Sequence, residues 1–483
     1  MQELDLTTIK KRSVGGVFAL TSRTFLVNII SYAASLIIFT ALSPREVGIY
    51  TAVIAMQRII SFFTDFGLGA ALVQKKDNPS DVDLSTVFTV QALATGCMFL
   101  FIFLLKDSIG TFFKLNLEGT TLLAVLVFTI FISSFKTIPS ILLERNLNFH
   151  KLVIPQIVES LVFNIILVFL LFGHAGLASF SWAFLLSSLV GIPFYYLVSP
   201  WKIRFGVNKK SLSNLRFGIT FQAKNILATI KDDFLTVFLT KFLSFSDIGY
   251  IGFAQRNAFF AFRYVVDNVT KVSFSTYSRV QHDSKLLKSG IEKSLFFVSF
   301  TMSPLMLGLI VIMPYIVEFF PKWHNKWEPA IFSVIFFSLN ALVSSFSNIL
   351  INVLDATGRV KLTLKLMIVW TTLIWIITPF LLYKIGYNGV AIASFLVTLT
   401  IFYTVYLVKK VIPFNFFGSV YKPIVASCIM ATCIYLAEMW FARNLPLVLV
   451  IILFGAVIYT ISIYILAKQQ LREGIKLIVN KKT

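Results

Sequence analysis

Apolar runs long enough to cross a lipid bilayer recur along the whole chain of 483 residues. A membrane-spanning helix needs about 20 mainly apolar residues, because the hydrocarbon core of a bilayer is about 30 Å thick. Here 57% of the residues are hydrophobic and only 13% are charged, so polar groups are too few to cover a water-soluble surface. The sequence therefore predicts an all-α integral membrane protein.

Fourteen such runs predict fourteen transmembrane helices. The runs cover residues 16–42, 46–68, 84–105, 120–142, 152–172, 177–199, 216–241, 249–275, 291–318, 328–353, 361–383, 387–410, 418–440 and 446–467. The first twelve form two sets of six, and a pair follows them. We therefore expect an N-terminal six-helix lobe at 1–206, a C-terminal six-helix lobe at 207–412, and an additional helix pair with a basic cytoplasmic tail at 413–483.

Positive charges divide unevenly between the two sides of this arrangement. With a cytoplasmic N-terminus, the predicted cytoplasmic segments hold 27 of the 43 Lys and Arg residues, and the predicted outer loops hold 8. Because cytoplasmic loops carry an excess of Lys and Arg, both termini are predicted to be cytoplasmic, in the inner or plasma membrane of a cell. No loop is long enough to fold as a soluble domain, so the helical bundle itself must carry the function.

Two loops of the chain repeat one another. Leu42–Tyr50 reads LSPREVGIY and Leu243–Ile251 reads LSFSDIGYI, at an offset of 201 residues. The same offset places Arg23 opposite Lys224, each in the first helix of its set. Because six is an even number of spans, the two lobes share one topology. They are expected to be related by an axis along the membrane normal, with a site between them.

Positively charged side chains within the spans are predicted to line a central cavity. Charge inside a membrane is costly unless it faces a cavity or a partner. The candidates are Arg23, Arg58, Lys136, Lys224, Lys231, Arg256 and Arg263. Arg58, Lys231 and Arg263 fall near mid-span, whereas Arg23, Lys224 and Arg256 lie near helix ends, where the alternative is snorkelling to the headgroups. Guanidinium and ammonium groups bind phosphate well in a desolvated site, so the cavity fits an anionic, amphipathic substrate.

Acidic side chains within the spans are candidates for a coupling proton or sodium ion, because burial raises the affinity of a carboxyl group for protons. They are Asp65, Glu159, Asp232, Asp233 and Asp267. Since Arg263 and Asp267 are four residues apart, an intrahelical ion pair is the alternative for these two. Beyond a proton or sodium ion, no cofactor is expected.

Several other classes of function are not expected from the sequence. The net charge of +21 would suggest nucleic acid in a soluble protein, but basic loops and a cationic interior account for it, so no nucleic acid partner is expected. The three cysteines lie in apolar runs and the four histidines are scattered, which predicts no metal site. The chain has no Walker A, HExxH or GxSxG sequence, so we expect no catalytic residues and no enzyme activity.

Five segments resemble the motifs of one family. They are Leu42–Tyr50, Asp65–Lys75 (DFGLGAALVQK), Leu143–Phe149 (LERNLNF), Lys326–Ala330 (KWEPA) and Asn352–Gly358 (NVLDATG). In order and spacing they are similar to those of the polysaccharide-unit flippases, the Wzx-type O-antigen and colanic-acid translocases of the multidrug/oligosaccharidyl-lipid/polysaccharide exporter superfamily. The resemblance covers nearly the whole chain.

The resemblance implies a substrate and a mechanism. Members of this family move polyprenyl-pyrophosphate-linked oligosaccharide repeat units from the cytoplasmic to the outer leaflet, by alternating access of two rocking lobes. The sugar and pyrophosphate would occupy the cationic cavity, and the lipid tail would stay among membrane lipids near the last helix pair. Polysaccharide polymerase and glycosyltransferases of the same pathway are the implied partners.

Three rival functions stay open at this stage. A multidrug antiporter of the same superfamily would export mostly cationic drugs, which a cavity rich in Arg and Lys should repel. A lipid II flippase would fit fourteen spans well, although the motifs are more similar to those of the polysaccharide group. A membrane polymerase or glycosyltransferase would usually bring a sizeable outer loop or a soluble domain, and the sequence predicts neither.

Overall fold

The computed structural model describes residues 26–64, 67–75, 77–209, 211, 226–227, 229–441 and 444–479. Within these ranges all regular secondary structure is helical, as the sequence predicts. Eleven helices of the described ranges are long and apolar enough to cross a membrane, which agrees with a multi-pass membrane protein.

The count of fourteen spans stays a prediction for three of the expected helices. The first overlaps the described helix Leu26–Ala41, which is shorter than a full span. The seventh, expected at 216–241, falls partly outside the described residues. The eighth lies within α11 (Phe245–Val280), whose charged residues keep its hydropathy below that of an ordinary span.

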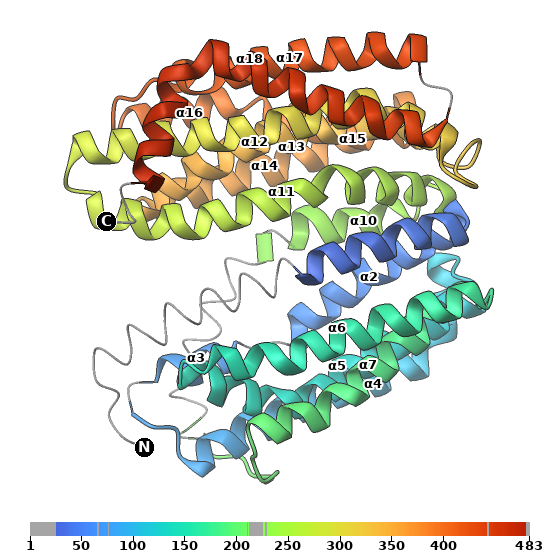
Figure 1. Cartoon of the computed structure of the whole chain (residues 1–483). Coiled ribbons are helices and arrows are strands. Elements are labelled where there is room, and N and C mark those ends of the chain that lie inside the picture. The colour runs from blue at the N-terminus through green and yellow to red at the C-terminus, as the bar shows by residue number, and fades with distance from the viewer. Residues whose placement is uncertain are drawn as a thin grey trace. The chain divides into compact units, whose positions relative to one another are not determined.

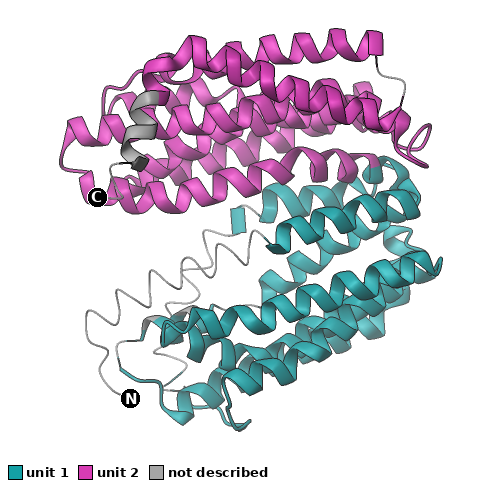
Figure 2. Ribbon diagram, in the orientation of Figure 1, with its two compact units in different colours: residues 1–249 teal, residues 250–483 magenta. Residues whose placement is uncertain are grey.

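The chain folds as two compact units, residues 1–249 and 250–483, coloured separately in Figure 2. The lobe boundaries expected at 206 and 412 stay a prediction from the sequence.

The first unit is a helical bundle built around α5 (Figure 1). Its helices are Leu26–Ala41, α2 (Pro44–Thr64), α3 (Leu68–Gln74), α4 (Asp81–Phe113), α5 (Leu117–Arg145), α6 (Phe149–Phe172), α7 (Ala178–Val198), the π-helical turn η1 (Ile230–Phe234) and α10 (Leu235–Leu239). Helix α5 packs against α2, α3, α4, α6 and α7. It is also among the most buried of the spans, because it has neighbours on most of its faces.

The second unit is organised in the same way around α13. Its helices are the main part of α11, α12 (Ser284–Phe319), the 3-10 turn η2 (Glu328–Ala330), α13 (Ile331–Ala356), α14 (Val360–Ile385), α15 (Asn388–Thr398), α16 (Ile401–Lys409), α17 (Phe416–Phe441) and α18 (Leu445–Val479). Helix α13 packs against α12, α14, α15 and α16. The last pair, α17 and α18, packs against α12.

The two repeated loops start their helices with the same hydrogen bonds. The Ser43 amide and hydroxyl both donate to the Glu46 carboxylate, and the Glu46 amide donates to the Ser43 hydroxyl. Ser244 and Asp247 make the same three bonds. Each is a capping box that satisfies amide groups left free by the first helical turn. The offset of 201 residues therefore relates equivalent structure as well as similar sequence.

Some helices extend well beyond their predicted spans. Helix α12 has 36 residues, which at 1.5 Å per residue is about 54 Å, longer than the hydrocarbon core. Its first two turns carry Lys285 and Lys288, and its N-terminus is capped by the Asp283 carboxylate, which accepts bonds from the amides of Lys285 and Leu286. A hydropathy window misses such ends because they are polar, although their backbone is helical.

The Lys326–Ala330 motif has a packing role. Trp327 is fully buried and its ring stacks on Phe253 of α11, with ring centroids 4.6 Å apart and an interplanar angle of 9°. Trp323 meets the same phenyl ring edge-on. The Tyr387 hydroxyl donates to the Pro329 carbonyl. This aromatic cluster joins α11, η2 and the start of α15 at one end of the second unit.

Candidate functional site

The first unit brings one charged residue of α2 beside three consecutive charged residues of η1. Helix α2 packs against η1, and Arg58 Nη1 lies 3.3 Å from Asp233 Oδ1, a contact across 175 residues. Lys231 Nζ lies 3.5 Å from Asp232 Oδ1. We call Arg58, Lys231, Asp232 and Asp233 the Arg58 cluster. All four are among the residues that the sequence singles out, but their pairing is a finding of the structure.

The three residues contributed by η1 lie in a π-helical turn, Ile230–Phe234. A π turn is wider than an α turn and packs less well, so it is rare and often marks a functional site. Sequence reasoning treats 216–241 as an ordinary span and misses this feature. The signal that could have revealed it is the run Lys231-Asp232-Asp233 inside an apolar segment, because three consecutive charges cannot share one face of an α-helix.

The electrostatics of the Arg58 cluster differ from those of a purely cationic pocket. Two cations and two carboxylates balance one another. The Arg58 side chain is 55% exposed, whereas Asp233 is 14% exposed. A guanidinium has five N–H donors, and among the described residues only Asp233 accepts from it, through Nη1. Because the side chain is more than half exposed and has donors to spare, an incoming phosphate can bind Arg58 beside Asp233 or displace it.

A second pair of predicted residues lies inside the first unit. Lys136 of α5 and Glu159 of α6 form an ion pair, with Nζ 2.6 Å from Oε1. Lys136 is only 9% exposed. The Glu159 carboxylate fills the space above Gly191 of α7, where an added Cβ would lie 1.7 Å from Oε1. The sequence assigns Lys136 to the cationic cavity and Glu159 to ion coupling, and the structure joins the two as one internally neutralised group.

The second unit contributes a charged stripe on α11. Arg263, Asp267 and Lys271 are exposed, and both cations act electrostatically on the Asp267 carboxylate. Arg256 is half-buried on the same helix. The spacing of this stripe agrees with one helical face. Since α11 belongs mainly to the second unit, convergence of Arg263 with Arg58 and Lys231 on a shared chamber stays a prediction.

Three predicted residues, Arg23, Asp65 and Lys224, lie outside the described residues. Their roles in substrate binding and ion coupling stay predictions. In the part of the chain that the structure describes, no three His, Cys, Asp or Glu side chains are grouped as a metal ion would require.

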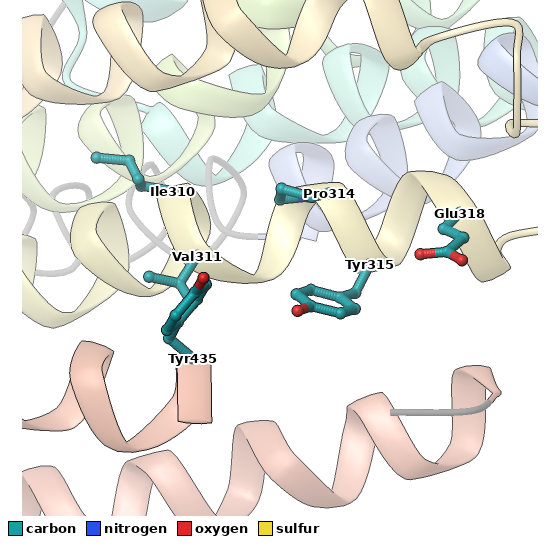
Figure 3. A pocket seen from close by; sticks show the side chains of 6 residues that line it. All are labelled: Ile310, Val311, Pro314, Tyr315, Glu318 and Tyr435. Carbon is teal, nitrogen blue, oxygen red and sulfur yellow. The ribbon is translucent and has the colours of Figure 1, made fainter. Parts of the chain in front are cut away.

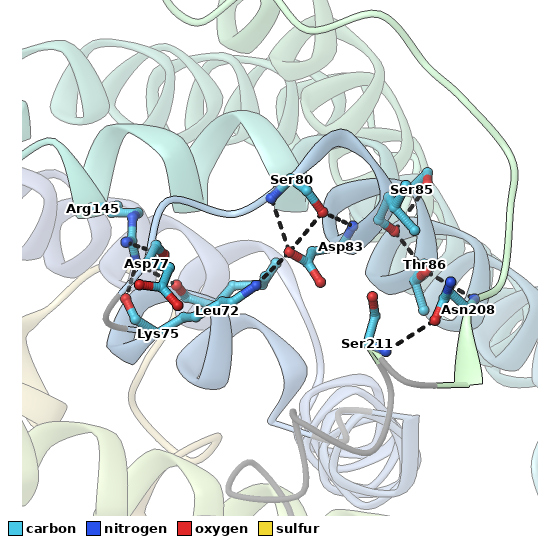
Figure 4. Close-up of polar contacts among 11 residues, drawn as sticks. Leu72, Lys75, Asp77, Ser80, Asp83, Ser85, Thr86, Arg145, Asn208 and Ser211 are labelled. Atoms are coloured by element: carbon cyan, nitrogen blue, oxygen red, sulfur yellow. Dashed lines mark hydrogen bonds and ion pairs between the residues drawn. The ribbon is translucent and has the colours of Figure 1, made fainter.

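A residue to which sequence reasoning assigned no role organises one end of the first unit. Arg145, at the C-terminal end of α5, donates to the backbone carbonyls of Leu72, Lys75 and Asp77 at 2.7–2.8 Å (Figure 4). It thereby satisfies carbonyl groups that the end of α3 leaves open. Lys75 in the same segment forms an ion pair with Asp83, the N3 residue of the α4 capping box. The segment between α3 and α4 is thus held by side-chain contacts from two helices.

Comparison with known proteins places the sequence among membrane proteins of polysaccharide biosynthesis. A family model described as "Polysaccharide biosynthesis protein" matches residues 40–332, more than half of the chain. The succinoglycan biosynthesis transport protein ExoT of Rhizobium meliloti (strain 1021) is 24% identical over 289 residues, 59% of this chain and 58% of that protein. The lipopolysaccharide biosynthesis protein WzxC of Escherichia coli (strain K12) is 23% identical over 330 residues, 66% of this chain and 65% of that protein.

The chain thus spans less than two thirds of the length of these two relatives. A third relative, an uncharacterized membrane protein in the cps region of Klebsiella pneumoniae, is 22% identical over 476 residues, 95% of this chain and 91% of that protein.

Two solved structures share the fold. The lipid II flippase MurJ in an inward closed conformation matches with a TM-score of 0.76 and 19% identity, over 94% of this chain and 99% of that one. A multidrug resistance MATE family transporter in an inward-facing conformation matches with a TM-score of 0.63 and 13% identity, over 81% of this chain and 98% of that one. At these identities the similarity is one of fold.

Proposed function

Because the chain belongs to the family of polysaccharide biosynthesis proteins whose model matches residues 40–332, we propose that it is a lipid-linked oligosaccharide flippase. It moves a polyprenyl-pyrophosphate-linked repeat unit from the cytoplasmic to the outer leaflet by alternating access, for surface polysaccharide biosynthesis. The activity is transport and involves no covalent chemistry.

The observation that carries this proposal is the arrangement of Arg58 against η1. Arg58 is held at one nitrogen by Asp233, 3.3 Å away, and keeps its other donors accessible. A planar fork of this kind matches the oxygens of phosphate or pyrophosphate. Asp233 acts as a substitute anion when no substrate is bound, which limits the cost of an unpaired cation in the membrane. Lys231 of the same cluster adds a second cation for the headgroup.

The exposed charges of α11 support the same conclusion. Arg263 and Asp267 are not covered by packing, and charges of this kind avoid hydrocarbon because their transfer to lipid is costly. They therefore require a water-filled space, which a translocation pathway provides. Arg256 extends the charged surface along the helix, and Arg23, Lys224 and Lys136 complete the proposed set of substrate-binding cations.

For energy coupling, the proposed proton or sodium sites are the acidic residues Asp65, Glu159, Asp232, Asp233 and Asp267. Glu159 is the most constrained of the described ones, because its carboxylate is fixed between Lys136 and Gly191. Binding of a proton there would release Lys136 from its ion pair and make that cation available to an anionic substrate.

The proposed location is the inner or plasma membrane with both termini in the cytoplasm, on the basis of the Lys and Arg distribution. Glycosyltransferases that assemble the lipid-linked unit and a polymerase that consumes it on the outer side are the proposed partners.

The test uses a host that lacks its own repeat-unit flippase but makes the lipid-linked unit. Wild-type protein should restore surface polysaccharide, and Arg58→Ala or Lys231→Ala should abolish it at an unchanged protein level in the membrane. Arg204→Ala is the matched control, since Arg204 also pairs with one carboxylate, Asp81, but both side chains are more than half exposed, so its loss costs little. Normal polysaccharide in both cluster variants would contradict the proposal.

Two rival substrates are tested with the same protein. Rescue of cells depleted of their own lipid II flippase would favour lipid II, the cargo named for the MurJ structure that shares the fold. Resistance to cationic drugs on overexpression would favour a drug antiporter. We expect neither, because the five family motifs and the matched family model both belong to polysaccharide biosynthesis.

A further inference from the structure

Helix α17 of the last pair carries a buried carboxyl group that no part of the proposed transport site uses. Glu438 is 1% exposed, and neither of its carboxylate oxygens has a hydrogen-bond partner among the described residues. It is the most deeply buried acidic side chain in the described part of the chain. Sequence reasoning assigns no role to it.

A pocket of about 500 Å³ lies between α12 and α17, the helix that carries Glu438 (Figure 3). Its lining residues are Ile310, Val311, Pro314, Tyr315, Glu318 and Tyr435. Tyr315 interacts electrostatically with Glu438, Tyr435 and Glu318. Tyr435 is one helical turn before Glu438 on α17, so the two side chains lie on neighbouring positions of one face.

The pocket reaches the end of its helices. Glu318 is exposed and stands one residue before the end of α12 at Phe319. Glu438 is three residues before the end of α17 at Phe441. The side chains of Glu318 and Tyr315 point into the same space in Figure 3. The pocket lining thus includes the exposed Glu318 near the end of α12 and Tyr315, which interacts electrostatically with the buried Glu438.

Among the described residues, no positively charged group is found to neighbour Glu438. The titratable groups around Tyr315, which interacts with Glu438, are Glu318 on α12 and Tyr435 on α17. Helix α18 contributes apolar Val448 and Ile451 to the surrounding core, and its segment 445–458 contains no ionisable residue. An ionised carboxylate in such surroundings would be unpaired and desolvated, which is too costly to persist, so the neutral acid is favoured.

We propose that Glu438 is a proton-binding site of the last helix pair, which exchanges its proton with water at the Phe319 end of α12 through the Tyr315 pocket. In the packed state the carboxyl group is neutral. Loss of the proton creates a buried charge and favours separation of α17 from α12, so the site couples proton occupancy to the packing of the last pair. The ligand is a proton, because a lone carboxyl without further oxygen ligands is a poor site for a metal cation.

This site is separate from the proposed substrate cations. In the described part of the chain no Lys or Arg lines the pocket, and its exposed acidic residue is Glu318, so the site offers nothing that would bind the pyrophosphate headgroup of the proposed substrate. Proton binding at Glu438 therefore does not depend on which substrate the protein transports, and it can be measured without a transport assay.

The first test is labelling of the full-length protein in lipid nanodiscs with dicyclohexylcarbodiimide, which reacts with protonated carboxyl groups in apolar surroundings. Mass spectrometry should locate the label at Glu438 at about pH 6, with at least about fivefold less label at exposed Glu318, and the label should decrease toward about pH 9. Glu438→Gln should remove this label, and Glu318→Gln should keep it.

Three results would overturn the proposal. Absence of label at about pH 6 in the wild type, together with restoration of label by Arg443→Ala, would mean an ionised carboxylate paired with that residue. Protection by sodium at constant pH would assign the site to a metal cation. Labelling that does not change with pH would exclude proton exchange through the pocket.

Infrared difference spectroscopy of the wild type and Glu438→Gln is an independent measurement that does not require a bulky reagent to enter. We expect the wild type to show a protonated carboxyl C=O band that the variant lacks and that shifts in heavy water. If no such band distinguishes the two proteins, Glu438 does not hold a proton. Because Gln has nearly the shape of the neutral acid, the variant should fold and remain in the membrane.

Discussion

Gly48 of α2 and Gly249 of α11 lie against each other in a reciprocal contact. A Cβ added to Gly48 would lie 1.6 Å from the carbonyl oxygen of Phe245, and one added to Gly249 would lie 1.9 Å from the carbonyl oxygen of Pro44. Residues 44 and 245, like 48 and 249, are 201 positions apart. The two repeated loops therefore meet one another with equivalent atoms, which only glycine permits.

Replacing either glycine should destabilise the protein. The clashing atoms belong to the backbone and cannot move aside as a flexible side chain can, so we expect Gly48→Ala and Gly249→Ala each to cost about 3 kcal/mol in the free energy of unfolding. The measurement is thermal unfolding of the purified protein by tryptophan fluorescence. Gly308→Ala is the control, because its added Cβ would meet only the ends of two side chains, Met430 at 3.5 Å and Ile312 at 4.0 Å. Equal melting temperatures of all three variants would contradict a close contact between Gly48 and Gly249.

Removing only Lys136 from the Lys136–Glu159 ion pair should destabilise the protein more than removing both residues. Lys136→Met leaves the Glu159 carboxylate unpaired in a largely buried position, with an expected loss of about 3 kcal/mol. The double variant Lys136→Met with Glu159→Leu should recover most of that loss, because no charge remains. Melting temperatures of the three proteins give the comparison. If the proposed role in transport holds, the stable double variant should still fail to restore surface polysaccharide.

Removing the Arg145 contacts should loosen the segment between α3 and α4. Arg145→Ala leaves the carbonyl groups of Leu72, Lys75 and Asp77 without their donor, and Arg145→Lys should do nearly the same, because an ammonium cannot reproduce the guanidinium fork. We expect faster trypsin cleavage after Lys75 in both variants. Trypsin should cleave the control variant Arg204→Ala at the wild-type rate. Unchanged cleavage of the Arg145 variants would contradict a role of the Arg145 hydrogen bonds in holding this segment.

The predicted topology can be checked at two exposed loop positions. In a protein without its three native cysteines, Asn325→Cys in the loop after α12 should react with a membrane-impermeant maleimide added to intact cells. His282→Cys, in the loop between α11 and α12, should react only after the membrane is permeabilised. The reverse pattern would invert the assignment of the termini to the cytoplasm.

The sequence by itself determined those properties that depend on residues close together along the chain. The membrane class follows from the energy of transferring each apolar run into lipid, and the repeat is visible because Ser43–Glu46 and Ser244–Asp247 form capping boxes within four residues. The sequence alone also selects the charged residues that are candidates for substrate binding or ion coupling, because a charge within a membrane span is unusual whatever its contacts. The family motifs likewise identified the family that the matched model describes.

Only the tertiary structure decided which charged groups meet. Arg58 bonds to Asp233, 175 residues away, and Lys136 bonds to Glu159 on the next helix. Glu438 has no hydrogen-bond partner among the described residues. These outcomes depend on how each helix is rotated about its axis and on which helix it packs against. Hydropathy fixes neither, because lipid surrounds a transmembrane helix evenly, and helix association in the membrane depends on detailed packing between side chains.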